Sequence, residues 1–263
     1  MNNNKIGCII QARVLSSRLP AKILLNGFDK PLLLHTVERL KKSAKLDKII
    51  VATTNLKIDN VIFNLCKKNK ILVFRGHPTN LLNRYYNCAK KFKFKNIIRI
   101  TSDCPLMDSK IIDVMIGKYK KLKVDYFSNV HPPTFPDGFD IEIFSFESLQ
   151  KAFFNAKEDF QKEHVTPFIW DQPKKFIIKN YYYKKEKNLY NKFRLTLDYI
   201  EDYFVINQIY NALYLKNKYF SFEDVLKFIK KNPKIMVNRN LIKVNWYKNY
   251  LKNLKTIKKK DTK

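Results

Sequence analysis

The first hundred residues alternate between two hydrophobic patterns. The segments near 33–40, 61–65 and 81–89 carry apolar residues at helical spacing. Between them stand short apolar runs rich in Ile and Val, with the length and composition of buried strands: Ile6–Gln11, Lys48–Thr53, Ile71–Arg75 and Asn96–Ile100. Strands that alternate with helices are typical of βαβ units, so this half predicts a mostly parallel sheet. A fourth helix is expected at Ser109–Lys121, with Ser109 as its N-cap.

The second half of the chain is less regular. A Pro-rich loop at His131–Gly138 separates the first two of its expected strands. The pattern predicts strands at Asp125–Ser128, Phe139–Phe144, Phe176–Tyr183 and Phe193–Leu197, and helices at Ser145–Asn155, Ile200–Leu213 and Phe222–Asn232. Without an internal repeat or a clear linker, we predict one α/β domain over residues 1–240 with a mixed, mostly parallel central sheet. A Lys-rich basic tail is expected over residues 241–263.

Composition supports a folded chain and complicates the meaning of its charge. A chain of 263 residues that is 45% hydrophobic can bury a sizeable core, which excludes intrinsic disorder as its main state. The formal net charge of +29 first suggests nucleic acid as a partner. However, 44 of the 52 basic residues are Lys and only 8 are Arg, the residue that nucleic-acid readers favour. Most of the charge is therefore interpreted as a solvated basic surface. A basic nucleic-acid-binding protein stays as an alternative, without a recognition helix or a zinc site to support it.

The cysteines and the apolar runs bear on the compartment. Four scattered cysteines form no CxxC pair and no zinc-like spacing, which is typical of a reducing cytosol. The polar N-terminus does not resemble a signal peptide, and no apolar run approaches 18 residues. We therefore predict a cytoplasmic protein without a transmembrane segment.

The segment from Gln11 to Lys22 is the first candidate for chemistry. It follows the first expected strand, and ligands of open α/β sheets bind at the carboxyl ends of strands. Arg13, Arg18 and Lys22, with two small hydroxyl residues between the arginines, suit a polyphosphate. The alternative is an ordinary basic loop, but two of only eight arginines stand here. No Walker A motif is present.

Two aspartates stand at corresponding places after other expected strands. Asp103 follows the strand that ends at Ile100, and Asp198 follows Phe193–Leu197. Alone, Asp103 could be a turn residue and Asp198 a helix N-cap. Together, they would place two carboxylates at one sheet edge, the minimum for a Mg²⁺ that bridges substrate oxygens.

Two further segments carry candidate residues for a second substrate. In a strand over Phe139–Phe144, Asp140 and Glu142 would share one face, after a turn at Gly138. A solvated strand face would explain this pair equally well. His164 is a lone histidine, for which a structural hydrogen bond is the main alternative to a role with substrate.

These segments occur together and in one order, from about Lys5 to Asn232. They read IIQARVLSSRLPAKIL, RGHPTNLLNRYY, RITSDCPLMD, FPDGFDIEIFSFESL, EHVTPFI and RLTLDYIEDY. The combination resembles the spore-coat polysaccharide cytidylyltransferase-like family and, more distantly, the CMP-Kdo synthetases and acylneuraminate cytidylyltransferases. One departure is that Asn80 and Asn83 stand where acids are usual in these proteins.

The resemblance implies a GT-A-like (Rossmann-like) nucleotidyltransferase domain with a defined set of site residues. Arg13, Arg18 and Lys22 would hold the triphosphate, and Asp103 and Asp198 would hold Mg²⁺. Residues that would complete the nucleotide site are Gln11, Ala12, Ser17, Ser102 and, near base and ribose, Arg84. Residues that would border the acceptor are Asp140, Glu142 and His164.

The implied reaction is a Mg²⁺-dependent transfer of CMP from CTP to a sugar acid or a phosphorylated small acceptor, in surface polysaccharide biosynthesis. Arg13 and Lys22 would stabilise the departing pyrophosphate, and Asp103 would fix the metal beside the α-phosphate. Asp140 or a metal-bound hydroxide would be the base for a hydroxyl acceptor. The resemblance also allows a homodimer. Two enzymatic alternatives are a nucleotidyltransferase that joins another NTP to a sugar 1-phosphate, and a glycosyltransferase, although the SDCP turn is not a DxD motif.

Overall fold

A seven-stranded sheet organises the computed structural model, which describes residues 5–183 and 188–243. In spatial order its strands are β5 (Leu72–Gly76), β4 (Lys48–Thr54), β1 (Ile6–Gln11), β6 (Asn96–Thr101), β8 (Glu142–Ser145), β7 (Tyr126–Ser128) and β9 (Ile178–Asn180). The first four strands are parallel to one another, whereas β8 is antiparallel to both β6 and β7. The predicted α/β fold with a mixed, mostly parallel sheet is confirmed.

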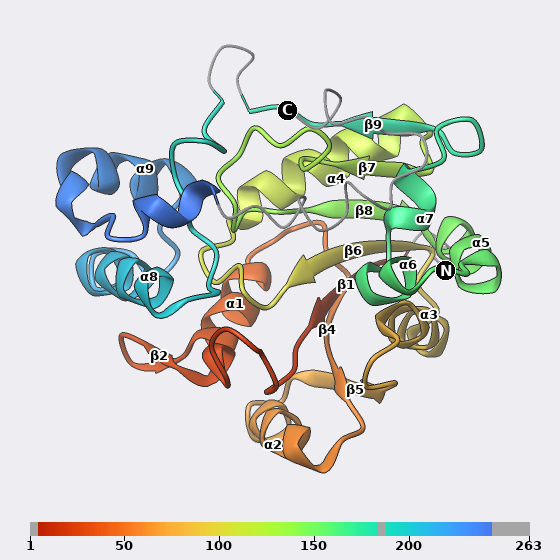
Figure 1. Cartoon of the computed structure of the whole chain (residues 1–263), viewed down its shortest axis with the longest axis horizontal. Helices are drawn as coiled ribbons and strands as arrows, with labels where there is room; N and C mark the ends of the chain where they lie inside the picture. The colour runs from red at the N-terminus through yellow and green to blue at the C-terminus, as the bar shows by residue number, and fades with distance from the viewer. Residues whose placement is uncertain (1–4, 184–187, 244–263) are drawn as a thin grey trace.

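Helices cover both faces of this sheet because its strands are apolar on both sides (Figure 1). In β1, Ile6, Cys8 and Ile10 face one core, and Ile9 faces the other. The first core is closed by α1 (Leu32–Leu40), α2 (Asn60–Lys68) and α4 (Ser109–Leu122). The second is closed by α3 (Leu81–Phe92), α5 (Phe146–Asn155) and α7 (Pro167–Trp170), with α6 (Asp159–His164) beside α3.

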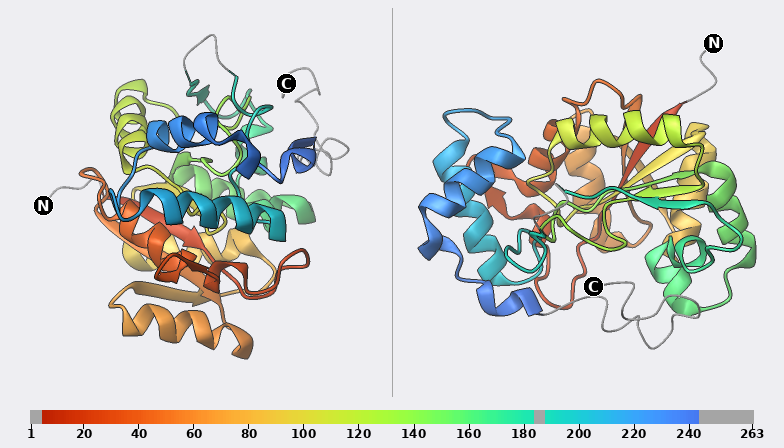
Figure 2. Two further views of the ribbon diagram at one scale, coloured as in Figure 1. Left: turned by 90° about the vertical axis from the view of Figure 1, so that its left-hand side faces the viewer. Right: turned by 90° about the horizontal axis from the view of Figure 1, so that it is seen from above.

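Two further helices, α8 (Ile200–Leu213) and α9 (Phe222–Lys231), lie beyond the end of the sheet toward which β6 points (Figures 1 and 2). They form a third apolar cluster with Phe139 and Leu195. The hydroxyl of Tyr210 on α8 donates to the carbonyl of Pro105, 2.7 Å away, in the loop that follows β6. The carboxyl edge of the sheet therefore lies under a helical layer that contacts its loops directly.

Short elements complete the described fold. A two-stranded ribbon pairs β2 (Asn26–Gly27) with β3 (Lys30–Pro31). Single 3₁₀ turns are η1 (Lys22–Leu24), η2 (Lys57–Asp59), η3 (Pro233–Ile235) and η4 (Arg239–Lys243). The predicted basic tail begins inside η4, and its residues 244–263 lie outside the described part of the chain. No helix among the described residues is long and apolar enough to cross a membrane.

Three expected strands differ from the structure. Phe193–Leu197 is not a strand; it makes one isolated bridge, between Arg194 and Asp137. The strand expected at Phe139–Phe144 begins only at Glu142, because the side chain of Asn129 takes the preceding bonds. Its amide donates to the Phe139 carbonyl at 2.7 Å and its oxygen accepts from the Ile141 amide at 2.8 Å.

The third strand, and one helix, differ in where they begin or end. The strand expected at Phe176–Tyr183 is ordered as a strand only over Ile178–Asn180, where it pairs with β7. Ser109 is not the N-cap of α4. Asp108 takes that position, and its carboxylate accepts from the Lys110 amide at 2.8 Å, so Ser109 is the first helical residue.

Gly138 brings two loops of the carboxyl edge into contact. Its φ is +106°, and a Cβ there would lie 2.3 Å from the carbonyl of Leu195. We expect Gly138→Ala to lower the free energy of unfolding by at least about 2 kcal/mol, because alanine meets both a strained backbone and a fixed one. Urea unfolding measures this loss.

Gly117 in α4 is the matched control. A Cβ there meets only the end of the flexible Lys45 side chain. Gly117→Ala should be neutral or stabilise by up to about 1 kcal/mol, as expected of alanine in a helix. Equal effects of the two substitutions would contradict the role assigned to Gly138.

Candidate active site

Four charged segments meet at the carboxyl edge of the sheet, under α8. They are the loop after β1 (residues 12–22), the turn after β6 (102–105), the loop before β8 (137–140) and the segment before α8 (194–198). The parallel strands β1, β4, β5 and β6 all end at this edge, which is where open α/β sheets bind ligands.

The loop after β1 is held in a closed shape by a buried carboxylate. The Ala21 amide donates to the Val14 carbonyl at 2.9 Å and closes the loop. The Val14 amide donates to Asp59 at 2.7 Å, and Asp59 also accepts from the Thr54 hydroxyl. Asp59 is buried, and no sequence motif pointed to it. It fixes the loop from which Arg13, Arg18 and Lys22 project.

Lys22 lies between the two aspartates that the sequence predicted as metal ligands. Its Nζ donates to Asp103 Oδ2 at 3.0 Å and to Asp198 Oδ1 at 2.7 Å. Arg18 donates to the same Asp198 oxygen at 2.7 Å. The Lys22 side chain is only 10% exposed, whereas that of Arg18 is 48% exposed. The structure therefore brings Arg18, Lys22, Asp103 and Asp198 together, as predicted.

Arg194 pairs with three acidic residues of the site. Its guanidinium contacts both oxygens of Asp202, at 2.9 and 3.1 Å, as well as Asp137 at 3.1 Å and Asp198 at 3.3 Å. Asp202 accepts from the amides of Asp198 and Tyr199 and so caps the start of α8. Asp198 is thus not the helix cap. Sequence reasoning assigned no role to Arg194, Asp137 or Asp202, although all three lie in or beside the quoted segments.

The cations and the carboxylates shift one another's proton affinity. Burial alone would raise the pKa of Asp198, but Lys22 and Arg18 together hold that pKa well below its ordinary range. Asp137 behaves differently. Burial and three neighbouring carboxylates outweigh Arg194 and raise its pKa. Burial, then Asp137 and Asp103, raise the pKa of Asp140 well above its ordinary value. Neighbouring carboxyls at this edge therefore differ in their affinity for a proton.

The other residues predicted for nucleotide binding line the same edge. Arg13 and Ser17 are exposed on the loop after β1, and Arg13 has no hydrogen-bond partner among the described residues. Ala12 is buried and donates its amide to Ala52 at 3.1 Å. Gln11 accepts from Arg99 at 3.1 Å, and the Ser102 amide donates to the Gln11 carbonyl at 3.2 Å. Ala12 and Gln11 therefore order the backbone, and Arg13 and Ser17 face solvent.

Arg84 is buried, and its guanidinium is occupied by the chain's own backbone. It donates to the carbonyl of His77 at 2.8 and 3.0 Å and to that of Pro78 at 2.9 Å. Burial lowers the pKa of Arg84 to about 10. The residue fixes the loop ahead of α3. Any effect of Arg84 on the nucleotide would therefore be indirect, through the position of that loop.

Glu142 does not lie beside Asp140 on a strand face, so that prediction is wrong. Asp140 precedes β8, and Glu142 is buried at the start of the strand. Its carboxylate accepts from Arg99, from the Tyr126 hydroxyl at 2.5 Å and from the Thr166 hydroxyl at 2.6 Å. Burial opposes ionisation, but Arg99 prevails and lowers the pKa of Glu142. The glutamate therefore holds the Arg99 side chain in place through an ion pair.

His164 ends α6, and its side chain is 37% exposed. Burial, together with the nearby Arg99, lowers its pKa to about 4. The imidazole is therefore neutral at pH 7, which suits a hydrogen-bonding residue better than a cationic one.

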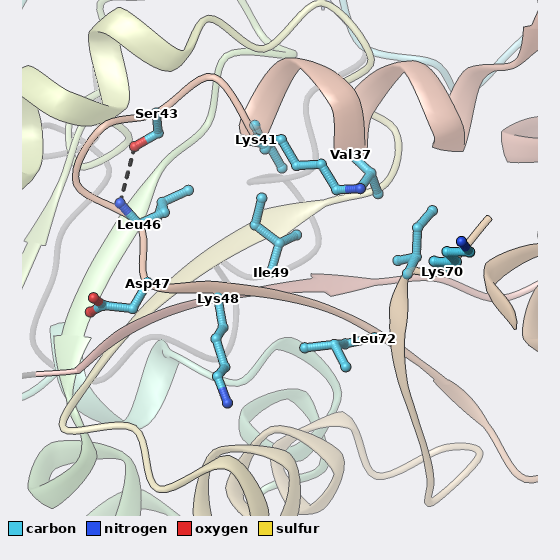
Figure 3. Close-up of a pocket in the computed structure, with 11 residues that line it drawn as sticks. Val37, Lys41, Ser43, Leu46, Asp47, Lys48, Ile49, Lys70 and Leu72 are labelled. Atoms are coloured by element: carbon cyan, nitrogen blue, oxygen red, sulfur yellow. Dashed lines mark hydrogen bonds between the residues drawn. The ribbon is translucent and has the colours of Figure 1, made fainter.

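A hollow on the surface lies at the opposite end of the strands, where β4 and β5 begin (Figure 3). It measures about 270 Å³ and is lined by residues near the end of α1 and the amino ends of β4 and β5, including Val37, Lys48 and Leu72. The charged groups described above do not line it. The candidate site is therefore defined by converging polar groups and not by this hollow.

The side chains available as ligands limit how a metal could be bound. Among residues 5–183 and 188–243, no group of three or more Asp, Glu, His and Cys side chains is arranged to hold one. Asp103 and Asp198 nevertheless lie close enough for one ammonium to contact both. The two carboxylates fit a cation that takes its remaining ligands from substrate and water.

This sheet, with a basic loop and paired carboxylates at its carboxyl edge, defines an α/β protein of the nucleotidyltransferase type. Residues 7–243 match the family described as "Cytidylyltransferase". The chain belongs to the cytidylyltransferase family and is a nucleotidyltransferase. The family resemblance stated from the sequence is confirmed.

Two relatives are similar to most of this chain. The uncharacterized protein MJ1063 of Methanocaldococcus jannaschii is 40% identical over 241 residues, 90% of this chain and 96% of that protein. The spore coat polysaccharide biosynthesis protein SpsF of Bacillus subtilis is 31% identical over 211 residues, 79% of this chain and 87% of SpsF.

Solved structures show the same fold. A cytidylyltransferase from Leptospira borgpetersenii superposes with a TM-score of 0.84 at 37% identity, over 89% of this chain and 98% of that one. CMP:2-keto-3-deoxy-manno-octonic acid synthetase in complex with CTP gives a TM-score of 0.59 at 14% identity, over 81% of this chain and 100% of that one. At that identity the second likeness concerns the fold alone.

The raised pKa of Asp137 leads to a prediction about stability. In an unfolded chain this carboxyl titrates near pH 4. Because its folded pKa is higher, the folded state binds more protons above that pH, and stability falls as the pH rises through the folded pKa. Asp137→Asn should therefore stabilise the protein at pH 8, by about 1 kcal/mol or more, and give no gain at pH 3.5.

Urea unfolding at the two pH values measures this difference. Asp159→Asn, at a fully exposed position on α6, is the control and should change little at either pH. A loss of stability in Asp137→Asn at pH 8 would show that the pairing with Arg194 outweighs the burial of the charge.

Proposed function

We propose that this cytidylyltransferase transfers CMP from CTP to a small acceptor, with the help of Mg²⁺, and releases pyrophosphate. The observation that carries this proposal is the arrangement of Lys22 between Asp103 and Asp198, with Arg13 and Arg18 on the same loop. Cations for the phosphates and carboxylates for a metal stand at one edge. Phosphoryl transfer needs chiefly positioning and charge neutralisation, which these groups supply.

Asp103 and Asp198 would hold the metal, because one cation can contact both carboxylates. Bound there, Mg²⁺ would supply positive charge that offsets the charge of the phosphates. The pKa of Asp198, held below its ordinary range, keeps that carboxylate ionised at any physiological pH. Arg194 binds the other oxygen of Asp198 and fixes the direction in which the carboxylate points.

Arg13, Arg18 and Lys22 would bind the triphosphate and stabilise the departing pyrophosphate. Arg13 and Arg18 are exposed enough to reach a ligand. The backbone and side chains of Gln11, Ala12, Ser17 and Ser102 would line the phosphates. The loop that Arg84 fixes would lie beside base and ribose.

Asp140 and His164 would border the acceptor. In its ionised form, Asp140 would accept a proton from an acceptor hydroxyl, and its raised pKa would make it a stronger base than an ordinary aspartate. If the acceptor already carries a phosphate nucleophile, no base is needed. Glu142 would act from a distance, by holding Arg99 in place.

We place the reaction in surface polysaccharide synthesis, with a sugar acid or a phosphorylated small molecule as acceptor. The similarity to SpsF, whose name assigns it to spore coat polysaccharide, supports this placement. A second candidate is transfer from another NTP to a sugar 1-phosphate. It is favoured by Asn80 and Asn83, which stand where the resemblance leads one to expect acids. Asn80 caps α3, where its side-chain oxygen accepts from the Asn83 amide at 2.9 Å.

Asp103→Ala should abolish pyrophosphate release and leave thermal stability nearly unchanged. Its carboxylate is 27% exposed and bonds Lys22, whereas its backbone carbonyl still anchors Leu197 at 2.9 Å. A coupled pyrophosphate assay and a thermal melt measure the two effects. The exposed Asp159→Asn variant should keep full activity. An active Asp103→Ala enzyme would overturn the metal assignment.

The nucleotide is tested with a panel of CTP, UTP, GTP and ATP, each offered with a set of sugar acids and sugar 1-phosphates. We expect pyrophosphate release with CTP and at most a few per cent of that rate with the others. Faster release with another NTP and a sugar 1-phosphate would favour the second candidate.

A further inference from the structure

Lys22 makes contacts that phosphate binding does not explain. Its ammonium bonds two carboxylates at 3.0 and 2.7 Å and is nearly removed from solvent. Paired with two carboxylates, the Lys22 side chain carries its ordinary positive charge. Lys22 thus lies between the two residues proposed to hold the metal.

The backbone of Lys22 is fixed, whereas its side chain can move. Closure of the loop between Val14 and Ala21, and the bond from Leu25 to the Lys22 carbonyl at 3.3 Å, hold its Cα in place. The four-carbon stem can redirect the ammonium by several ångströms through rotamer changes alone. Arg18 starts from a more exposed position on the same loop.

A divalent cation and the Lys22 ammonium compete for the same carboxylate oxygens. Displaced alone, the ammonium would be a poorly solvated charge without a partner, which is costly. A triphosphate removes that cost, because it offers the displaced ammonium new anionic oxygens and gives the metal further ligands. Asp198 keeps Arg194 on its second oxygen throughout, so it stays oriented.

From this geometry we infer that Lys22 is an internal counter-cation that keeps the two carboxylates closed to metal until a nucleotide arrives. Lys22 then moves from Asp103 and Asp198 to the phosphates as the metal enters. Metal and nucleotide binding are therefore positively coupled, each raising the affinity for the other by the same factor. The inference rests on the proposed function for its nucleotide and on the observed contacts for its first step.

The test measures binding of Mn²⁺, as a spectroscopic substitute for Mg²⁺, by electron paramagnetic resonance. Without nucleotide, Lys22→Met should bind Mn²⁺ at least about tenfold more tightly than the wild type, because a competing cation is removed. With a CTP analogue whose α,β-bridge is a methylene group, wild-type affinity for Mn²⁺ should rise strongly. In Lys22→Met the rise should be smaller, and the analogue itself should bind more weakly.

Two variants control the measurement. Lys22→Arg keeps a cation at the position and should retain the weak Mn²⁺ binding of the wild type. Lys30→Met removes a lysine that bonds a single carboxylate, Glu38, at 2.6 Å, and should leave Mn²⁺ affinity unchanged. Circular dichroism checks that each variant is folded. If Lys22→Met does not fold, Lys22→Arg still tests the inference, because tight Mn²⁺ binding by the arginine variant would contradict it.

Mn²⁺ affinity of Lys22→Met equal to or weaker than that of the wild type would overturn the inference. Equal affinity is the result expected of a residue that serves phosphate alone. Weaker affinity is the result expected of one that only holds the carboxylates together. The first measurement uses Mn²⁺ without nucleotide. A chain that released no pyrophosphate from CTP would therefore refute the proposed function and leave the first step of this inference standing.

Discussion

The arrangement of the site depends on keeping several carboxylates together at one edge of the sheet. Asp103, Asp137 and Asp198 come from three separate loops, and they would repel one another without cations between and behind them. Lys22 compensates them from the loop after β1, and Arg194 from the segment before α8. The same Arg194 binds Asp202 at the start of α8. The helical layer and the acidic site are therefore stabilised by one set of ion pairs, so neither is expected to form independently of the other.

The sequence predicted the parts of the site that follow from topology. In a parallel sheet, residues just after a strand fall at a common edge, so the positions of Lys22 and Asp103 could be inferred from strands alone. Asp198 was placed at the same edge from a strand over Phe193–Leu197 that the structure does not form. Strand predictions failed where the backbone takes its hydrogen bonds from elsewhere. Residues 139–141 bond the Asn129 side chain, and Leu197 donates its amide to the Asp103 carbonyl. Apolar composition alone cannot distinguish such a buried loop from a strand, because both bury their side chains.

The residues that sequence reasoning missed act through contacts between distant parts of the chain. Asp59 lies 45 positions from the Val14 amide that it accepts from, and Asn238 lies 36 positions from Asp202, to which it donates at 2.8 Å. Nothing in the local sequence marks either residue, because a buried Asp and a surface Asp have the same neighbours along the chain. Arg194 offered a signal that was not used. It is one of few arginines in a chain whose basic residues are mainly lysine, and it stands eight positions before the acid with which it pairs.

The split between arginine and lysine has a structural meaning throughout the molecule. Lysine supplies most of the +29 charge, but arginine supplies the connections at the carboxyl edge. A guanidinium can bond several oxygens in one plane, which an ammonium on a flexible stem does less well. Arg39 bonds the carbonyls of Leu106 and Met107 after β6, and Arg75 bonds that of Thr54 at the end of β4. Seven of the eight arginines lie at this edge or hold a loop that forms it: Arg13, Arg18, Arg39, Arg75, Arg84, Arg99 and Arg194. Arginine was scarce enough to be informative, and its distribution marks the site more sharply than net charge does.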